Sequence, residues 1–462
     1  MFEKALGIDT DGQHPLIYTL ETAAFNESFA DIFGTAAEFY ARERQCIPCP
    51  ANPGNRSCEQ RAGVSCLLGN YLLGEDQKGG TGFNRDMEHP SVSSYNNINY
   101  AINSAHAMGS IQSKVFWLLA QSGTNPWNNI SVTGIGRAAA EEVFYRALTQ
   151  HLTYSDSAFA SVRKATLATA CNPPFGSSSQ ACSSTAAAWD AVGVPANQID
   201  GSTFFVAQQY ADFLNRSPDA DGLTFWTNNI NNCAPQPSCI EGKRVDTSAA
   251  YFLSVEFQQT GYWVERMYKS AYGDTTGTST YGGSHQLSVP VVRFGDFLYD
   301  TQKVGKGVIV GQSGWEGVLE TNKHDFADQF VLRSQFTSAF PTSLTPAQFV
   351  DTLNTNAGNP LSSSERDGLV NDLTTGAKTR AQVLRAVVED QDLYNSEFNR
   401  AFVLMQYFGY LRRNPDSAPD MDYFGYDFWL QKLIQYNGNY TAAEMVKAFI
   451  ESVEYRQRFG QG

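Results

Sequence analysis

The sequence predicts a mainly α-helical protein, and three observations lead to this prediction. Apolar residues recur at helical spacing in many segments, and a repeat of helical character occupies the second half of the chain. The segments between these stretches are rich in Asn, Pro, Gly and Ser, which favour turns and loops. We therefore expect a helical bundle over residues 15–195, followed by two or more helical repeat modules with a short irregular or β insertion.

Composition limits the class of protein and its partners. A chain of 462 residues can form several domains, and 42% hydrophobic with 17% charged residues is typical of a globular protein. The net charge is −14 and no basic tract is present, which argues against nucleic acid or an anionic membrane as the partner. No apolar run approaches the roughly 20 residues that cross a bilayer, so we expect no membrane span.

The first half of the chain contains several predicted helices. Apolar spacing indicates helices over residues 110–120, 136–151 and 157–170, and in the stretch TAAAWDAVGV, which ends at Val194. A Gly near the end of that last stretch is a typical helix C-terminal signal.

An internal repeat organises the second half. The segment FVAQQYADFLNRSPDADGLTFW begins at Phe205, and a similar segment, FVLMQYFGYLRRNPD followed by FGYDFW, begins at Phe402. The repeat predicts two copies of one helical unit, at about 200–275 and 395–460. The matched positions are Tyr210 and Tyr407, Leu214 and Leu411, Arg216 and Arg413, Pro218 and Pro415, Asp219 and Asp416, Trp226 and Trp429, Ser254 and Ser452, and Glu256 and Glu454.

These patterns divide the chain into four expected parts. They are a helical domain over 1–195, a first repeat module over 196–275, a linker or insertion over 276–340, and a second repeat module over 341–462. Residues 274–300 are rich in Gly, Ser and Thr and indicate a linker that leads into the insertion.

The cysteines indicate an oxidising compartment, and hence secretion. All eight lie in three local groups of even number within Pro-, Gly- and Ser-rich segments, which is typical of disulfides that close loops. A four-cysteine zinc knuckle is the alternative for the first group, and the pairing within that group stays open. The groups are Cys46, Cys49, Cys58 and Cys66, then Cys171 and Cys182, then Cys233 and Cys239.

The stretch NESFADIFGTAAEFY, residues 26–40, carries the first candidate site. In a helix, Glu27 and Asp31 are four residues apart and share a face, while apolar residues cover another face. Two carboxylates on an otherwise apolar helix are costly to bury without a cation or a hydrogen-bond donor. The stretch therefore suggests part of a metal site.

Residues 15–45 and 82–195 resemble the C-terminal helical domain of the thermolysin-like zinc metallopeptidases. The resemblance rests on IYTLETAAFNESFADIFGTAAEFYA, GIGRAAAEEVFYRALTQHLT and AWDAVGV, which occur in the order of the family's landmarks. It implies a secreted endopeptidase that acts on protein or peptide substrates and uses zinc. In that chemistry the metal lowers the pKa of a bound water to about 7, and the water attacks the peptide carbonyl.

The resemblance also implies roles for five residues. Glu27 matches the zinc-ligand Glu, and Asp31 matches the acid that accepts the N–H of the first zinc histidine. Tyr18 matches a phenol beside the scissile carbonyl, and Arg85, in RDMEHP, matches the guanidinium that binds a substrate carbonyl. His106, in SAHAMGSIQSK, matches the histidine that donates to the tetrahedral oxyanion, where such donors contribute a few kcal/mol each.

The chain also departs from the family. The motif His-Glu-x-x-His is absent, and family spacing places Gly7 and Lys4 where a zinc histidine and the catalytic Glu would stand. Ala101 replaces an acid that orients the oxyanion histidine, and Met108 stands where a polar residue is usual. The chain alone thus lacks two zinc ligands and the catalytic Glu, and its start also lacks a signal peptide.

Two functions remain open at this stage. The first is the C-terminal part of a secreted zinc endopeptidase. In this case the N-terminal part with the zinc motif is missing, and the chain is truncated and inactive as it stands. The alternative is a non-catalytic extracellular binding or scaffold protein built on a degenerate peptidase fold with helical repeats.

Calcium is a second metal that the resemblance suggests. Glu38 and Glu75 match carboxylates of the family's paired calcium site, and Asn70 falls where a ligand Asp is common. The cysteine-rich segment 46–66 replaces much of that loop. We therefore expect a calcium site near Glu38 and Glu75, although half of the carboxylates expected for that site are missing.

The string SPDADGLTFW resembles a helical domain of unknown function from secreted bacterial proteins. Pro218 and Asp219 are expected to start a turn, and Trp226 is expected to pack on the next helix. A calcium site at Asp219 and Asp221 and a glycan-binding aromatic face are weaker alternatives, because the aromatic residues have the spacing of a helical core. The modules are expected to bind a cell-surface or extracellular partner.

Overall fold

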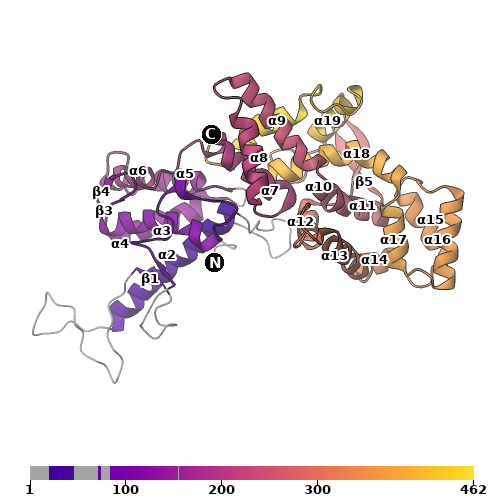
Figure 1. Ribbon diagram of the computed structural model, residues 1–462, viewed down its shortest axis with the longest axis horizontal. Helices are drawn as coiled ribbons and strands as arrows, with labels where there is room; N and C mark the ends of the chain where they lie inside the picture. Colours follow the sequence, from indigo (N-terminus) through magenta and orange to yellow (C-terminus); the bar gives the residue numbers. More distant parts are fainter. Residues whose placement is uncertain (1–19, 46–70, 74–83, 154–155, 462) are drawn as a thin grey trace, which may run out of the picture.

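The structure, a computed structural model, describes residues 20–45, 71–73, 84–153 and 156–461. Most of these residues are helical, and their strands form short two-stranded antiparallel pairs (Figure 1). The predicted mainly α fold class is confirmed. None of the described helices combines the length and the apolar character that crossing a membrane requires.

The helices of the first half lie together in one group (Figure 1). Helices occupy all four stretches that the apolar spacing predicted. Helix α6 ends at Gly193, whose φ of +75° is the left-handed conformation that glycine adopts without strain. The elements are α2 (Leu20–Gln45), α3 (Ala105–Gln121), α4 (Arg137–Arg146) with a π-helical turn (Ala147–His151), α5 (Phe159–Ala170) and α6 (Gln180–Val192).

Small residues let α2 and α3 pack closely along each other. A Cβ atom on Gly109 would lie 2.5 Å from the carbonyl oxygen of Ala24, so only glycine fits at that position. The hydroxyls of Ser28 and Ser113 meet across the same interface at 3.1 Å. This close approach brings the carboxylate face of α2 next to the first turn of α3.

Two short strand pairs flank this bundle. Strand β1 (Leu72–Leu73) pairs antiparallel with β2 (Arg85–Asp86), with Leu73 opposite Arg85. Strand β3 (Gly123–Thr124) pairs with β4 (Ser131–Val132). The first of these pairs fixes the backbone of Arg85, which is one of the candidate site residues.

The second half is a larger helical assembly. Its first five helices are α7 (Ser202–Leu214), α8 (Ala220–Asn231), α9 (Pro237–Leu253), α10 (Val255–Gln259) and α11 (Gly261–Tyr272). Its last helices are α18 (Gln391–Met405) with a π-helical extension (Gln406–Leu411), α19 (Phe424–Gln435), α20 (Met445–Glu451) and α21 (Val453–Gln457). Between them lie α12 (Phe294–Val304), α13 (Trp315–Phe330), α14 (Ser334–Ala339), α15 (Pro346–Asn356), α16 (Ser363–Thr375) and α17 (Arg380–Val388).

Residues 274–300 are regular structure instead of the open linker that their composition suggested. Strands β5 (Asp274–Ser279) and β6 (His285–Pro290) form an antiparallel hairpin, and α12 follows. The backbone N–H of Tyr423 donates to Thr278, which attaches the hairpin to the segment before α19. The strand pairing and the contact with Tyr423 therefore stabilise a hairpin in a stretch whose composition favours turns.

Matched positions of the predicted repeat make the same ion pair twice. Arg216 donates through Nε and Nη2 to both oxygens of Glu256, at 2.7 and 2.8 Å. Arg413 donates in the same way to Glu454, at 2.6 and 3.0 Å. Such bidentate pairs fix the planes of both groups. The repeat stays a prediction, and these duplicated contacts support it.

A glycine beneath a tyrosine also recurs. A Cβ atom on Gly222 would lie 2.0 Å from the hydroxyl of Tyr210, and one on Gly425 would lie 2.2 Å from that of Tyr407. In the first copy Asp219 begins α8 by accepting from the N–H of Gly222 at 2.7 Å. Asp219 therefore acts as a helix cap, where the sequence had indicated a turn.

Two predicted disulfides form within the described residues. Cys171 bonds Cys182, and Cys233 bonds Cys239. Both bridges join cysteines of one local group, as their spacing predicted. The first group, Cys46 to Cys66, lies outside the described residues.

Most of the aromatic residues proposed as a glycan-binding face belong to the core. Tyr407, Phe408, Tyr410, Tyr423 and Tyr426 are buried. Phe424 is exposed, while Phe428 and Trp429 are half-buried. Helical spacing thus indicated packing, which is the more common use of such residues.

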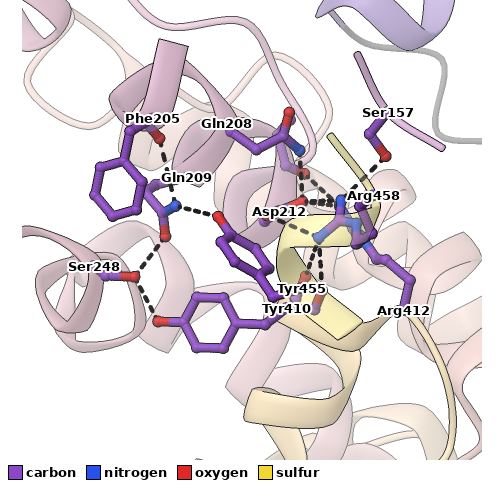
Figure 2. A network of polar contacts seen from close by, with 12 residues as sticks. Ser157, Phe205, Gln208, Gln209, Asp212, Ser248, Tyr410, Arg412, Tyr455 and Arg458 are labelled. Atoms are coloured by element: carbon purple, nitrogen blue, oxygen red, sulfur yellow. Dashed lines mark hydrogen bonds and ion pairs between the residues drawn. The ribbon is translucent and has the colours of Figure 1, made fainter. Parts of the chain in front are cut away.

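A buried ionic network joins the two ends of the second half (Figure 2). Asp212 of α7 has no exposed side-chain surface and receives hydrogen bonds from Arg412 and Arg458, each at 2.9 Å. Gln208 donates to the same carboxylate at 2.7 Å. The two guanidinium groups also donate to backbone carbonyls, including those of Ala211 and Tyr410.

A second set of contacts runs beside it (Figure 2). Ser248 donates to the side-chain oxygen of Gln209 and meets the hydroxyl of Tyr410, both at 2.6 Å. The amide of Gln209 donates to the hydroxyl of Tyr455 at 3.1 Å. Residues of α7 and α9 are therefore bound to residues close to the C-terminus.

Arg458 extends this connection to the first half of the chain. Its backbone carbonyl accepts from the N–H of Ser157 and from the hydroxyl of Ser161, both at 2.8 Å. Its guanidinium donates to the hydroxyl of Ser157 at 3.2 Å. One arginine thus contacts the start of α5, helix α7 and the π-helical extension of α18.

We expect the variant Asp212→Asn to destabilise the protein by about 3–5 kcal/mol, because two buried guanidinium groups lose their shared counter-charge. The unfolding midpoint in urea measures this loss. The matched control is Asp351→Asn, since Asp351 pairs with Arg366 but is largely exposed. Equal midpoints for the two variants would contradict the role given to Asp212.

Candidate functional site

The structure brings together four of the predicted site residues. Glu27 and Asp31 lie on α2, Arg85 on β2 and His106 on the first turn of α3. Tyr18 and Glu75 lie outside the described residues. The four residues come from three elements that are far apart in the sequence, and they meet at one end of the α2–α3 interface.

Arg85 and Asp31 form a bidentate ion pair. The Nε atom of Arg85 donates to Oδ2 of Asp31 at 2.7 Å, and Nη2 donates to Oδ1 at 2.5 Å. Asp31 is buried and Arg85 is half-buried, so the pair is partly shielded from solvent. The hydrogen bonds from the guanidinium to Asp31 raise the pKa of Arg85 above its ordinary value. The pair fixes the plane of the guanidinium.

Glu27 and His106 form the second pair. The Nδ1 atom of His106 lies 3.1 Å from Oε2 of Glu27, and about half of the His106 side chain is exposed. Ser104 caps α3 by accepting from the N–H of Ala107, which sets where the helix begins. Met108 is buried in the core, so this departure from the family serves packing.

A cleft of about 430 Å³ opens beside these pairs. Its volume is that of a small-ligand or peptide subsite. Donors and acceptors from β2, the following loop and α3 surround it. The lining residues that carry polar side chains are Asn84, Arg85, Asp86, His89, Ser91, Ser104, His106 and Ser110.

The predicted roles of these residues stay predictions, but the geometry bears on them. Both oxygens of Asp31, which was expected to orient a zinc histidine, accept from Arg85. Arg85 and His106, which were expected to face the substrate, both line the cleft. The described residues thus bring Arg85 and His106 to one cleft.

The described residues do not fit a zinc centre by themselves. No three side chains of His, Cys, Asp or Glu come together in the described ranges in a way that could hold a metal ion. Glu27, the predicted zinc ligand, lies within the described residues, and its Oε2 atom faces His106. A zinc site would need at least two further ligands from elsewhere.

Calcium is likewise not assembled by the described residues. Glu38 is half-buried on α2, about three turns beyond Glu27. Its expected companions Asn70 and Glu75 fall outside the described ranges. The calcium site stays a prediction.

Sequence reasoning missed Glu21, which anchors the same helix. Its fully buried carboxylate accepts from the hydroxyl of Tyr100 at 2.6 Å, the N–H of Phe159 at 2.7 Å and the amide of Gln198 at 2.6 Å. Burial raises the pKa of Glu21 to about 7, although its hydrogen bonds lower it. An acid within the apolar run IYTLETAAF was the signal available in the sequence.

Comparisons with known proteins identify this region. Residues 15–194 match the family model described as the thermolysin metallopeptidase, alpha-helical domain. The chain is 33% identical over 195 residues to a bacillolysin of Bacillus caldolyticus, and 33% identical over 191 residues to a thermolysin of Alicyclobacillus acidocaldarius subsp. acidocaldarius. It is 30% identical over 184 residues to neutral protease B of Bacillus subtilis (strain 168). The predicted thermolysin-type helical domain is therefore confirmed.

The matched region is a part of each protein. The first two matches cover 40% of this chain and 31% of each relative, and the third covers 39% and 29%. The chain thus spans less than a third of the length of these relatives. Residues 195–462 lie beyond the matched family model.

We expect Glu21 to make folding stability depend on pH. Its folded pKa of about 7 exceeds the ordinary value of 4.5, so its contribution is fully present below pH 4.5 and is lost as the pH rises through 7. The loss amounts to about 3 kcal/mol. In Glu21→Gln this decline should disappear, because the amide does not titrate. Thermal unfolding between pH 4.5 and 8 measures it, with exposed Glu142→Gln as the control; parallel profiles for the wild type and Glu21→Gln would refute it.

Proposed function

We propose that the thermolysin-type helical domain of this chain forms the peptide-binding side of a metalloendopeptidase site, as the C-terminal part of a secreted zinc enzyme that hydrolyses peptide bonds in proteins. One observation carries the proposal. Arg85 and His106 come from different elements, line one cleft, and are each held by a carboxylate of α2. Paired nitrogen donors beside a cleft are suited to bind the oxygens of a peptide.

Arg85 is positioned to bind a carbonyl oxygen. Its Nε and Nη2 groups donate to Asp31, so binding of a peptide carbonyl falls to the remaining Nη1 group. Because Asp31 fixes the guanidinium plane, little conformational entropy is lost when a peptide binds. Asp31 is therefore a positioning residue in this proposal.

His106 is positioned to meet a developing negative charge. Its Nδ1 atom faces Glu27, which leaves Nε2 for a ligand. When Nδ1 carries its proton toward Glu27, Nε2 donates to an oxyanion only from the protonated ring. Glu27 holds the ring through Nδ1, so the carboxylate acts as a positioning residue for His106.

The zinc that this family uses would act as a Lewis acid, but the described residues do not supply its site. The sequence carries no His-Glu-x-x-His motif. We therefore assign to this chain the binding and orientation of the peptide, and expect no hydrolysis by these 462 residues alone.

Secretion and an extracellular partner complete the proposal. The disulfides Cys171–Cys182 and Cys233–Cys239 suit an oxidising compartment. The helical modules beyond residue 195 are proposed to bind a partner at a cell surface or in the extracellular medium. The Arg458 contacts would hold these modules against the peptide-binding domain.

The non-catalytic alternative has support from one observation. Glu27 is already satisfied by His106 within the described residues, so the carboxylate does not require a metal there. Zinc analysis and casein hydrolysis by the purified chain separate the two candidates. Stoichiometric zinc with chelator-sensitive cleavage would exclude a non-catalytic protein, whereas peptide binding without zinc or cleavage agrees with both candidates.

We expect Arg85→Lys to weaken the binding of an N-acylated apolar dipeptide amide about tenfold, because lysine cannot bind Asp31 and a carbonyl together in fixed geometry. Isothermal titration calorimetry measures the dissociation constant. Arg146→Lys is the matched control, since Arg146 forms a partly exposed pair with Glu142 on α4. An unchanged affinity in Arg85→Lys would remove the basis of the proposal.

A further inference from the structure

A second cleft, of about 710 Å³, lies in the part of the chain beyond the thermolysin-type domain. It is bounded by α9, α10, α11, α13, α17 and α18, none of which contributes to the candidate peptide site. Three cationic side chains line it, namely Arg266, Lys323 and Arg385. The first two are almost fully buried, which is unusual for cations.

Arg266 is a buried cation without an ion pair among the described residues. Its side chain is 3% exposed, and its guanidinium lies over the rings of Tyr262 and Tyr394, at 4.4 and 4.9 Å. Its Nε and Nη1 groups donate to the carbonyls of Tyr262 and Val388. Its Nη2 group makes no hydrogen bond within the described ranges, which leaves donors for a ligand.

The neighbouring acid does not neutralise Arg266. Glu265 is fully buried, and burial together with the nearby charge of Glu397 raises its pKa well above the ordinary value. The buried Oε2 atom of Glu265 has no hydrogen-bond partner within the described residues, so it does not accept from Arg266. The positive charge of Arg266 is left to the cleft.

Lys323 places a second cation in the same wall. Its Nζ atom donates to Oε1 of Gln259 at 2.6 Å and lies 3.7 Å from Oε1 of Glu389. Burial lowers the pKa of Lys323 to about 8. Glu389 and Glu320 act in the opposite direction, while Arg385 and Arg266 lower the pKa further. The carboxylates present thus do not compensate for the burial of this ammonium group.

The two carboxylates of the cleft are already engaged. Glu320 accepts from Arg385 at 2.8 and 3.0 Å. Glu389 accepts from Arg385 and from Nε1 of Trp263, both at 3.0 Å. Three cations against two carboxylates leave one positive charge in excess, within a chain whose net charge is −14. A buried charge of this kind is costly unless an anion accompanies it.

The mouth of the cleft indicates what the anion is attached to. Leu253 and Val255 are 44% and 54% exposed there, and side-chain amides of Gln258 and Gln391 complete the lining. The volume suits a small organic molecule. We propose that this cleft binds a small organic carboxylate, with the carboxylate on Arg266 and Lys323 and the apolar body against Leu253 and Val255.

Succinate is the probe for this proposal, because its carboxylate groups flank a short apolar body of two methylene groups. Calorimetric titration of the full chain at constant ionic strength is expected to show one saturable site. Dimethyl succinate, which has the same body without charge, is expected not to bind, and sulfate is expected to bind more weakly. No saturable binding of succinate, or sulfate binding as tight as succinate, would overturn the assignment.

One variant and its matched control test the contribution of Lys323 to succinate binding. Lys323→Met is expected to weaken succinate binding about tenfold, since one charge-assisted hydrogen bond is lost. Lys306→Met, at an exposed lysine outside the cleft, is expected to leave it unchanged. Equal losses in both variants would overturn the proposal.

Glu320→Gln avoids the risk that loss of a buried lysine unfolds the protein, because Glu320 is largely exposed. Removal of its negative charge raises the positive excess of the cleft and is expected to tighten succinate binding roughly threefold. An unchanged or weaker affinity in this variant would contradict the site.

Discussion

The buried carboxylate of Asp212 is the contact on which the arrangement of this protein depends. Two guanidinium groups, from Arg412 and Arg458, converge on it from segments about 200 and 246 residues away in the sequence. A buried charge pair adds little net stability compared with an apolar core, but an incomplete one is strongly unfavourable. An alternative packing of the helices that displaces either arginine would leave a buried charge unpaired and raise the free energy of the fold. The network therefore favours a single arrangement of these helices. Because the backbone of Arg458 also binds Ser157 and Ser161, this selection includes the thermolysin-type domain.

Helix α2 shows how the same residue type serves different purposes along one element. Near its start, the carboxylate of Glu21 is fully buried and holds three other segments through neutral donors. About two and three turns further, Glu27 and Asp31 pair with the side chains of His106 and Arg85 at the edge of the cleft. The difference follows from the partners available at each depth. Amide and hydroxyl donors suffice where packing is complete, whereas the cleft edge is open enough for charged groups.

Much of the fold followed from periodicity, because helices depend on local spacing of apolar residues. The stretches 110–120 and 157–170 were readable in this way, and the two local disulfides followed from the grouping of the cysteines. The hairpin over Asp274–Ser279 and His285–Pro290 was not, because its stability comes from pairing and from contacts with the segment before α19. The grouping of Glu27, Asp31, Arg85 and His106 followed from resemblance to a family. The second cleft had no such signal, since its walls come from six helices whose contacts no local pattern encodes.

The contacts of Glu27 and Asp31 show that these two acids do not require a metal ion. Two carboxylates on an apolar helix suggested a metal, because a cation would offset the cost of burying them. In the structure His106 and Arg85 already meet that need, at 3.1 Å and through two hydrogen bonds respectively. The fold therefore has a reason to keep both acids whether or not zinc binds, and their presence alone does not distinguish a peptidase from a binding protein. Peptide binding by Arg85 and His106 would instead separate a functional cleft from a structural one, since a purely structural role would require only their pairing with α2.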